Sequence, residues 1–156
     1  PGDVSALTGV STGLLLQWAK NGLVKVARRG APKGRGRTIY FSERDVFVTA
    51  MIRTLTARGL TLSYIKPLTR FLNELTIEQI GDAARQHKVL VAAGAAMKPS
   101  FVDLDSGPLG QAAADAGRSG MNEIMLTMPM AVAWEKYQAG IDHYDKHLAR
   151  VAAPLN

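Results

Sequence analysis

The chain has 156 residues, 47% of them hydrophobic and 21% charged, which is the balance of an ordinary globular protein. It has no cysteine, so disulfides, thiolate metal sites and thiol redox switches are excluded, and no apolar run approaches the ~20 residues of a membrane-spanning helix. Residues 1–70 hold 12 Lys/Arg and 3 Asp/Glu, a net charge of +9, whereas residues 71–156 hold 7 and 10, a net of −3. This segregation indicates nucleic-acid binding by the first half.

Residues 3–41 have the pattern of two short helices joined by a tight turn. Gly9 permits the sharp turn, and Ser11 is a favourable N-cap for the second helix. The sequence Asn21-Gly22 is expected to end that helix, because these residues accept a left-handed conformation. The predicted apolar face of the second helix consists of Leu14, Leu15 and Trp18.

Residues 25–37 form a basic segment with six cations, no anion, three glycines and one proline. Short β-branched runs flank it at 24–26 and 38–41, so the segment is predicted to be a basic hairpin between two strands. A hairpin after a helix-turn-helix is the arrangement of a winged helix, and this wing suits the backbone of duplex DNA. The alternative interpretation is a disordered, solvated loop.

Three more helices are predicted before residue 88. Ser42 should cap the first of them, and Gly59 should end it. Thr61 should cap the second. Residues 76–79 have the sequence of a capping box, which predicts a third helix that ends near His87.

The pattern changes at Lys88. Residues 89–94 and 100–105 are predicted to form a β-hairpin, and residues 111–116 a short helix. Residues 123–128 are predicted to form a third strand, although helix and strand compete in this run.

A last helix is predicted from Pro129 onward. Its apolar residues alternate by steps of four and three, as in an a/d seam about three heptads long. The seam either packs on the chain's own small sheet or pairs with a second copy. We expect a homodimer, because one small domain contacts few base pairs and two-fold operators match two-fold proteins. The residues expected at the dimer contact are Trp134, Tyr137, Ile141, Tyr144 and Leu148.

The sequence thus predicts a mainly α fold with a small α+β part. Residues 1–75 are expected to form a winged helix-turn-helix DNA-binding domain, and residues 76–87 a connecting helix. Residues 88–156 are expected to form a small α/β segment with a C-terminal helix, for dimerisation or for effector binding.

The candidate DNA contacts are polar and basic side chains. A recognition helix must present polar groups to base edges in the major groove, and small residues between the wing's cations allow close approach to phosphates. Trp18 is interpreted as a core anchor rather than a base contact. The predicted contacts are Ser11, Thr12, Gln17, Lys20 and Asn21 in the helix, Arg28, Arg29, Lys33, Arg35 and Arg37 in the wing, and Tyr40, Arg53 and Arg58 beyond it.

Enzyme chemistry has little support. The sequence contains no phosphate-loop, dinucleotide-binding or nucleophile-elbow motif. His143 and His147 have the spacing of metal ligands on a helix, but no third ligand accompanies them, and a solvated helix face explains them better. No catalytic residue, metal or cofactor is therefore predicted. The methionines at 121, 125, 128 and 130 either fill gaps in a core or line an adaptable ligand pocket.

Several motifs together resemble a known family. The run LTGVS at 7–11 with Leu15 and Trp18, the tripeptide NGL at 21–23, the basic wing and S-x-R-D-V at 42–46 are similar to the DNA-binding domain of the MerR (mercury-resistance regulator) superfamily. The similarity continues to Leu75 and covers roughly the first half of the chain. Two features depart from the family. Gly13 and Leu16 stand where many relatives have arginines, and residues 76–87 are too short for the long antiparallel dimer helix of the relatives.

The resemblance implies a bacterial, cytoplasmic transcription regulator that binds promoter DNA at the nucleoid. In the family, a homodimer bends and untwists an overlong promoter spacer so that RNA polymerase engages both promoter elements. The lack of cysteine excludes the family's thiolate metal sensing. One alternative is an excisionase-like or architectural DNA-bending protein, although the residues after Leu75 favour a regulator. Another is a regulator whose C-terminal segment senses a small-molecule effector.

Overall fold

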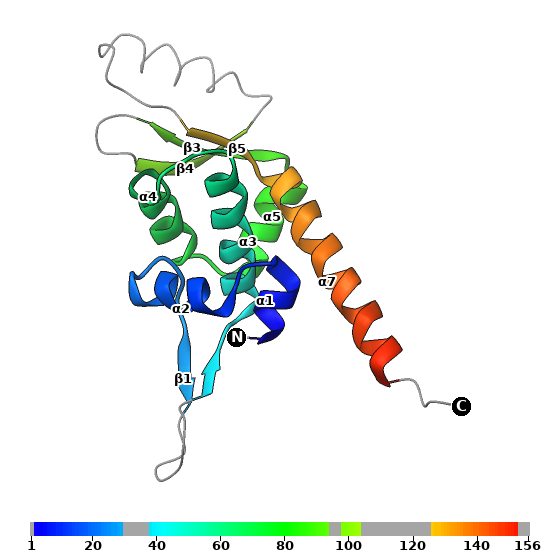
Figure 1. Ribbon diagram of the computed structural model, residues 1–156. Helices are drawn as coiled ribbons and strands as arrows, with labels where there is room; N and C mark the ends of the chain where they lie inside the picture. Colours follow the sequence, from blue (N-terminus) through cyan, green and yellow to red (C-terminus); the bar gives the residue numbers. More distant parts are fainter. Residues whose placement is uncertain (1, 30–37, 94–97, 104–125, 153–156) are drawn as a thin grey trace.

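The computed structural model describes residues 2–29, 38–93, 98–103 and 126–152 of the chain (Figure 1). The described elements form an N-terminal winged helix-turn-helix, three further helices, and a C-terminal three-stranded sheet followed by a long helix. The elements are α1 (Gly2–Thr8), α2 (Thr12–Lys20), β1 (Ala27–Arg29), β2 (Thr38–Tyr40), α3 (Glu43–Ala57), α4 (Leu62–Leu72), α5 (Ile77–Arg85), β3 (Lys88–Ala93), β4 (Lys98–Asp103), β5 (Leu126–Pro129) and α7 (Met130–Ala152).

Side-chain caps begin the helices where the sequence predicts them. At α3 the Ser42 hydroxyl accepts a hydrogen bond from the Asp45 amide (3.3 Å), and the Asp45 carboxylate accepts one from the Ser42 amide (2.8 Å). Thr76 and Gln79 exchange the same two bonds at α5 (3.3 and 2.8 Å). Both capping boxes satisfy amides that a helix N-terminus leaves unpaired. Thr61 is the N-cap of α4, but its side chain makes no capping bond.

The predicted turn glycines have the left-handed backbone that glycine adopts without strain. Gly9, Gly22 and Gly59 have φ of 65°, 70° and 84° and follow α1, α2 and α3. Gly9 is also crowded, because a Cβ there would collide with the guanidinium of Arg53. That guanidinium donates a hydrogen bond to the carbonyl of Thr8, so α3 holds the turn between α1 and α2.

Two antiparallel sheets are present in the described residues. The prediction of the first wing strand at 24–26 is wrong, because β1 is Ala27–Arg29 and Val24 is buried in the core instead. The wing strands pair Arg28 with Ile39, and the second sheet has the order β4-β3-β5, with the hairpin β3–β4 predicted from the sequence. The third strand is described at residues 126–129, which overlaps the predicted 123–128, and residues 123–125 lie outside the described residues. Pro129 ends this strand instead of beginning the last helix. The predicted helix at 111–116 lies outside the described residues.

Helix α3 is the centre of a continuous core. It buries residues around most of its circumference, because α1, α4 and α7 pack against it from different sides (Figure 1). The ring of Phe47, 1% exposed, lies 5.9 Å from the ring of Trp134 and 5.7 Å from that of Tyr137, the latter edge-on. This aromatic cluster (Phe47, Trp134 and Tyr137) joins the N-terminal helices to the C-terminal helix, and the sheet covers one end of them.

The seam of α7 packs within the chain along its first half. Burial, with a smaller contribution from the charge of Glu43, raises the pKa of Tyr137 to about 12. On α5, a Cβ at Gly81 would lie 3.2 Å from the ring of Trp134, so a glycine lets the two helices approach closely. Further along, the Tyr144 hydroxyl donates a 2.5 Å hydrogen bond to Asp3, which raises the pKa of Tyr144. Trp134 and Tyr137 therefore pack on Phe47 of α3 in their own chain, which is neither of the two predicted partners of the seam, the small sheet and a second copy.

Replacing Phe47 by alanine should lower the free energy of unfolding by about 3–5 kcal/mol, because it removes the central ring of the aromatic cluster and leaves a cavity. Urea denaturation followed by circular dichroism measures the change. The control is Val132→Ala, on the C-terminal helix α7 that packs on Phe47, at a side chain that is 45% exposed. This control should change the free energy of unfolding by no more than about 0.5 kcal/mol. A loss below about 1 kcal/mol for Phe47→Ala would show that the cluster does not join the two halves.

Candidate nucleic-acid interface

The predicted recognition helix is α2, and it exposes its polar residues. Leu15 and Trp18 are buried at 0% and 3% exposure, so Trp18 is a core anchor as the sequence indicates. The prediction that Leu14 joins this apolar face is wrong, because Leu14 is 39% exposed. Only a narrow stripe of α2, formed by Leu15 and Trp18 three positions apart, packs on the core. The side chains of the five predicted contacts are all exposed: Ser11, Thr12, Gln17, Lys20 and Asn21.

Two leucines extend the exposed face of α2. Leu16 is 40% exposed, close to the value for Leu14. Leu16 lies four positions before Lys20 and therefore on the same side of the helix, whereas Leu14 lies about 160° away around the helix, beside the buried stripe. The exposed surface of α2 is therefore partly apolar and partly polar.

The wing projects from the body next to α2 (Figure 1). Arg28 and Arg29 lie in β1, where their backbones pair with Ile39 and Thr38. Tyr40, at the base of β2, is 51% exposed. The other predicted wing contacts, Lys33, Arg35 and Arg37, lie outside the described residues.

A buried asparagine fixes the segment that connects α2 to the wing. The Asn73 side-chain nitrogen donates to the carbonyl of Leu23 (3.1 Å), and the backbone carbonyl of Asn73 accepts from the Lys25 ammonium (2.7 Å) and the Arg44 guanidinium (3.1 Å). Asn73 ends α4, so these bonds attach the start of the wing to the far end of that helix. Sequence reasoning missed this residue, whose partners are 29 to 50 positions away.

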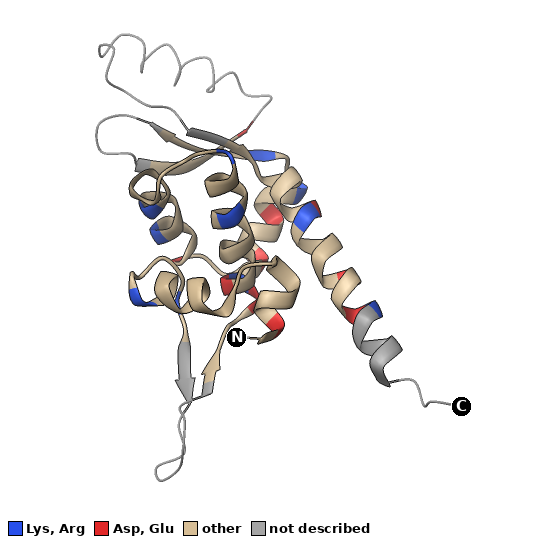
Figure 2. Ribbon diagram, viewed as in Figure 1, with Lys and Arg blue, Asp and Glu red and all other residues tan. Residues whose placement is uncertain are grey.

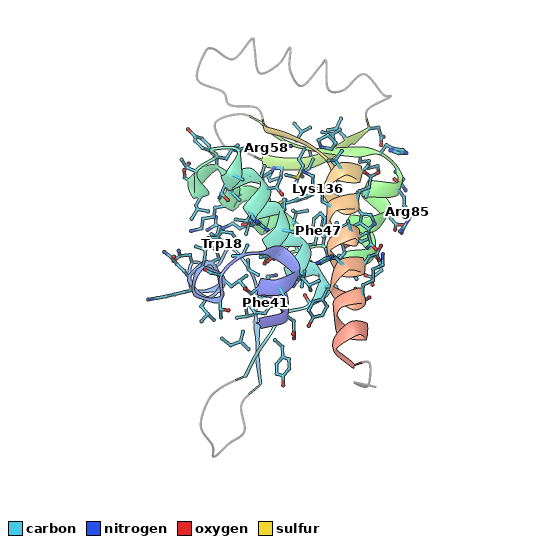
Figure 3. The ribbon with its side chains drawn as sticks, turned by 45° about the vertical axis from the view of Figure 1, so that its right-hand side comes forward. Trp18, Phe41, Phe47, Arg58, Arg85 and Lys136 are labelled. Carbon is cyan, nitrogen blue, oxygen red and sulfur yellow. The ribbon has the colours of Figure 1, made fainter. Side chains whose placement is uncertain are left out.

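The two arginines beyond the wing that are predicted DNA contacts, Arg53 and Arg58, lie at different places on α3. Arg53 supports the turn between α1 and α2 through its bond to Thr8. Arg58 is the C-cap of α3, at the opposite end of a 15-residue helix from the wing, about 22 Å along the helix axis. Figure 3 shows Arg58 together with Lys136 of α7 at that end.

Charge is distributed over the structure as the composition suggests. Helices α2 and α4 carry Lys20, Lys66 and Arg70 and no acidic residue. The described acidic residues lie on α1, the start of α3, α5, β4 and α7 and at Glu74 in the turn after α4 (Figure 2). The face with α2 and α4 is therefore basic, and an anionic polymer would be attracted to it.

The described part of the chain shows neither a metal-binding cluster nor a membrane-spanning helix. No group of three or more His, Asp or Glu residues is placed there to hold a metal ion. None of the helices between residues 2 and 152 that the structure describes has the length and apolarity to cross a membrane.

Comparison with known proteins supports the same interpretation. Residues 1–72 match the MerR HTH family of regulatory proteins. A search of curated proteins finds no match to the chain. The matched segment contains α1 to α4 and both wing strands, whereas α5, the three-stranded sheet and α7 lie beyond it.

Replacing Asn73 by alanine should lower the free energy of unfolding by about 1 kcal/mol, because the buried carbonyl of Leu23 loses its donor. The loss of stability should be small for a buried hydrogen bond, because the substitution also removes the Asn73 side-chain oxygen, which is buried without a hydrogen-bond partner and therefore destabilises the native chain. Glu74→Ala, at the exposed neighbouring position, is the matched control for the same denaturation experiment. Equal stability of the two variants would contradict the role given to Asn73.

Proposed function

We propose that the chain binds promoter DNA as a homodimer and distorts it. The premise is that residues 1–72 belong to the MerR HTH family, which makes the chain a DNA-binding transcription regulator. The observation that carries the proposal is the exposed face of α2 with the paired wing strands next to it, on the basic side of the molecule. In the bacterial cytoplasm the target would be a promoter, and RNA polymerase would act on the distorted DNA. Deformation lets a protein discriminate between sequences at bases that it does not touch.

The recognition helix has the groups for a mixed polar and apolar readout. A glutamine can pair with adenine through two hydrogen bonds, which suits Gln17, and Lys20 can contact a phosphate or a guanine. Leu16 replaces an arginine that many relatives have, and an exposed leucine can contact the methyl group of thymine. We therefore expect an A·T-rich half-site, whereas an arginine in place of Leu16 would favour guanine.

The wing supplies most of the charge at the interface. If its five arginine and lysine residues predicted as contacts each neutralise one phosphate, the log–log slope of affinity against salt is about −4.5 per protomer. Asn73 fixes the base of the wing relative to α2, so the two elements approach the DNA as one unit.

The first functional test is the binding of the full chain to random duplex DNA at several salt concentrations, followed by sequencing of the bound pool. We expect a steep negative slope and an enriched inverted repeat. Arg28→Ala with Arg29→Ala should make the slope shallower by about 1.8 per protomer, whereas Arg85→Ala, on α5 outside the basic face, should leave it unchanged. A steep slope without any enriched sequence would replace the regulator with an architectural DNA-bending protein. No binding at low salt would contradict both functions.

Dimerisation is proposed through the outer part of α7. Trp134 and Tyr137 pack on Phe47 in the same chain, so they are not available to a partner. The helix continues to Ala152 and extends past the body of the molecule (Figure 1), and its seam positions there include Leu148. An apolar seam on a projecting helix favours pairing with a second copy.

The mass in solution tests the dimer. We expect twice the 16.8 kDa of the chain by light scattering, and the single-chain mass for Leu148→Asp, because a buried charge disrupts a helix seam. Lys146→Asp, near Leu148 on the helix but off the seam, is the control and should remain dimeric. A native protein of 16.8 kDa would contradict the dimer.

A further inference from the structure

A cavity of about 220 Å³ lies between α3, β5 and α7, where the matched N-terminal segment meets the rest of the chain. Its walls are mostly apolar and include Met51, Met128, Val132 and Ala133. Met51 and Met128 are buried in the core, whereas Val132 is 45% exposed, so the cavity has a closed floor and an open rim. The cavity is thus accessible from solvent and lined from both halves of the protein.

The volume and lining suit a small ligand with an apolar body. An engineered apolar cavity of about 150 Å³ binds benzene, so this cavity has room for one ring or a short alkyl chain and a small polar head. Methionine side chains adjust to ligands of different shapes because they are unbranched and polarisable.

Among the lining residues that the structure describes, two are cations and none is a carboxylate. Arg58 comes from the end of α3 and Lys136 from α7, and Figure 3 shows them together. Within the described residues, the ion pairs join Arg44 to Asp45, Arg85 to Asp82 and Lys88 to Asp103, so neither lining cation has an anionic partner in that part of the chain. A second hollow shares Arg58 and Lys136 and adds Arg53, which makes the surroundings of the cavity more positive.

We propose that this cavity binds a small carboxylate with an apolar body, of the size of a monocyclic aromatic acid or a short fatty acid. The body occupies the apolar floor, and the carboxylate lies between Arg58 and Lys136, where charge-assisted hydrogen bonds hold it. Apolar walls with a few well-placed polar groups are typical of small-molecule sites.

The position of the cavity gives such a ligand a route to the DNA-binding face. Helix α3 continues from Arg58 through the residues that hold the turn of the helix-turn-helix, and Ser42 at its other end joins it to the wing. A ligand that joins α3 to α7 would be an effector; this role rests on the proposed function, whereas the binding itself does not.

The experiment is isothermal titration of the full chain with benzoate and hexanoate, and with benzamide and hexanamide as neutral analogues of the same shape. We expect at least one acid to bind, about tenfold or more tighter than its amide, because the amide lacks the charge that Arg58 and Lys136 recognise. Lys136→Gln should weaken the binding of the acid by a similar factor. Lys146→Gln, on the same helix away from the cavity, should bind the acid like the native chain.

The outcomes separate this inference from the proposed function. Absence of heat with both acids at millimolar concentration, equal affinity for acid and amide, or native affinity in Lys136→Gln would each overturn the site. Thermal unfolding of Lys136→Gln checks that the variant is folded, and its DNA binding without ligand should equal that of the native chain. Failure to bind DNA would contradict the regulator and leave the titration unaffected.

Discussion

The structure depends on the burial of α3. A helix in a winged helix-turn-helix normally buries one side, but α3 buries residues from Val46 to Leu55 around most of its circumference. Such a helix needs neighbours on several sides. Helices α1 and α4 cover part of it, and α7 covers the side that carries Phe47. The C-terminal half is therefore part of the core of the DNA-binding unit, and removing it would expose an apolar surface that small domains rarely tolerate.

That constraint also positions the functional surfaces. With α7 and α5 on one side of α3 and the sheet across one end of the helices, the opposite side is left to α2, the wing and α4, whose helices carry cations and no acidic residue. The same arrangement makes α3 the connection between two sites. Its beginning joins the wing through Ser42, its middle holds the turn before α2 through Arg53, and its end reaches the cavity through Arg58. A single helix thus reaches both the proposed nucleic-acid surface and the proposed ligand site.

Local features of this fold were predictable from sequence, and long-range ones were not. The capping boxes at Ser42 and Thr76 join residues three positions apart, and the left-handed backbone at Gly9 needs only the glycine itself, so these patterns are visible in the chain. The bond from Arg53 that supports the turn spans 45 positions and is not. The heptad seam was visible too, but a periodic apolar pattern does not say which surface covers it, and Trp134 and Tyr137 proved to cover Phe47. Leu14 looked like a core residue because its spacing fits the apolar face, although the core meets only a narrower stripe of α2. Asn73 and the cavity at Lys136 combine residues far apart in sequence, and no local pattern marks them.

We propose that α2 and the wing are the surface that binds DNA. This can be tested by titrating the isotopically labelled chain with duplex DNA from the selected pool and following the amide chemical shifts in NMR spectra. We predict that the largest shifts occur from Ser11 to Asn21 and in β1 and β2, and that the amides of α5 stay unchanged. Shifts concentrated on α5 and the outer part of α7, with α2 unaffected, would contradict this proposal.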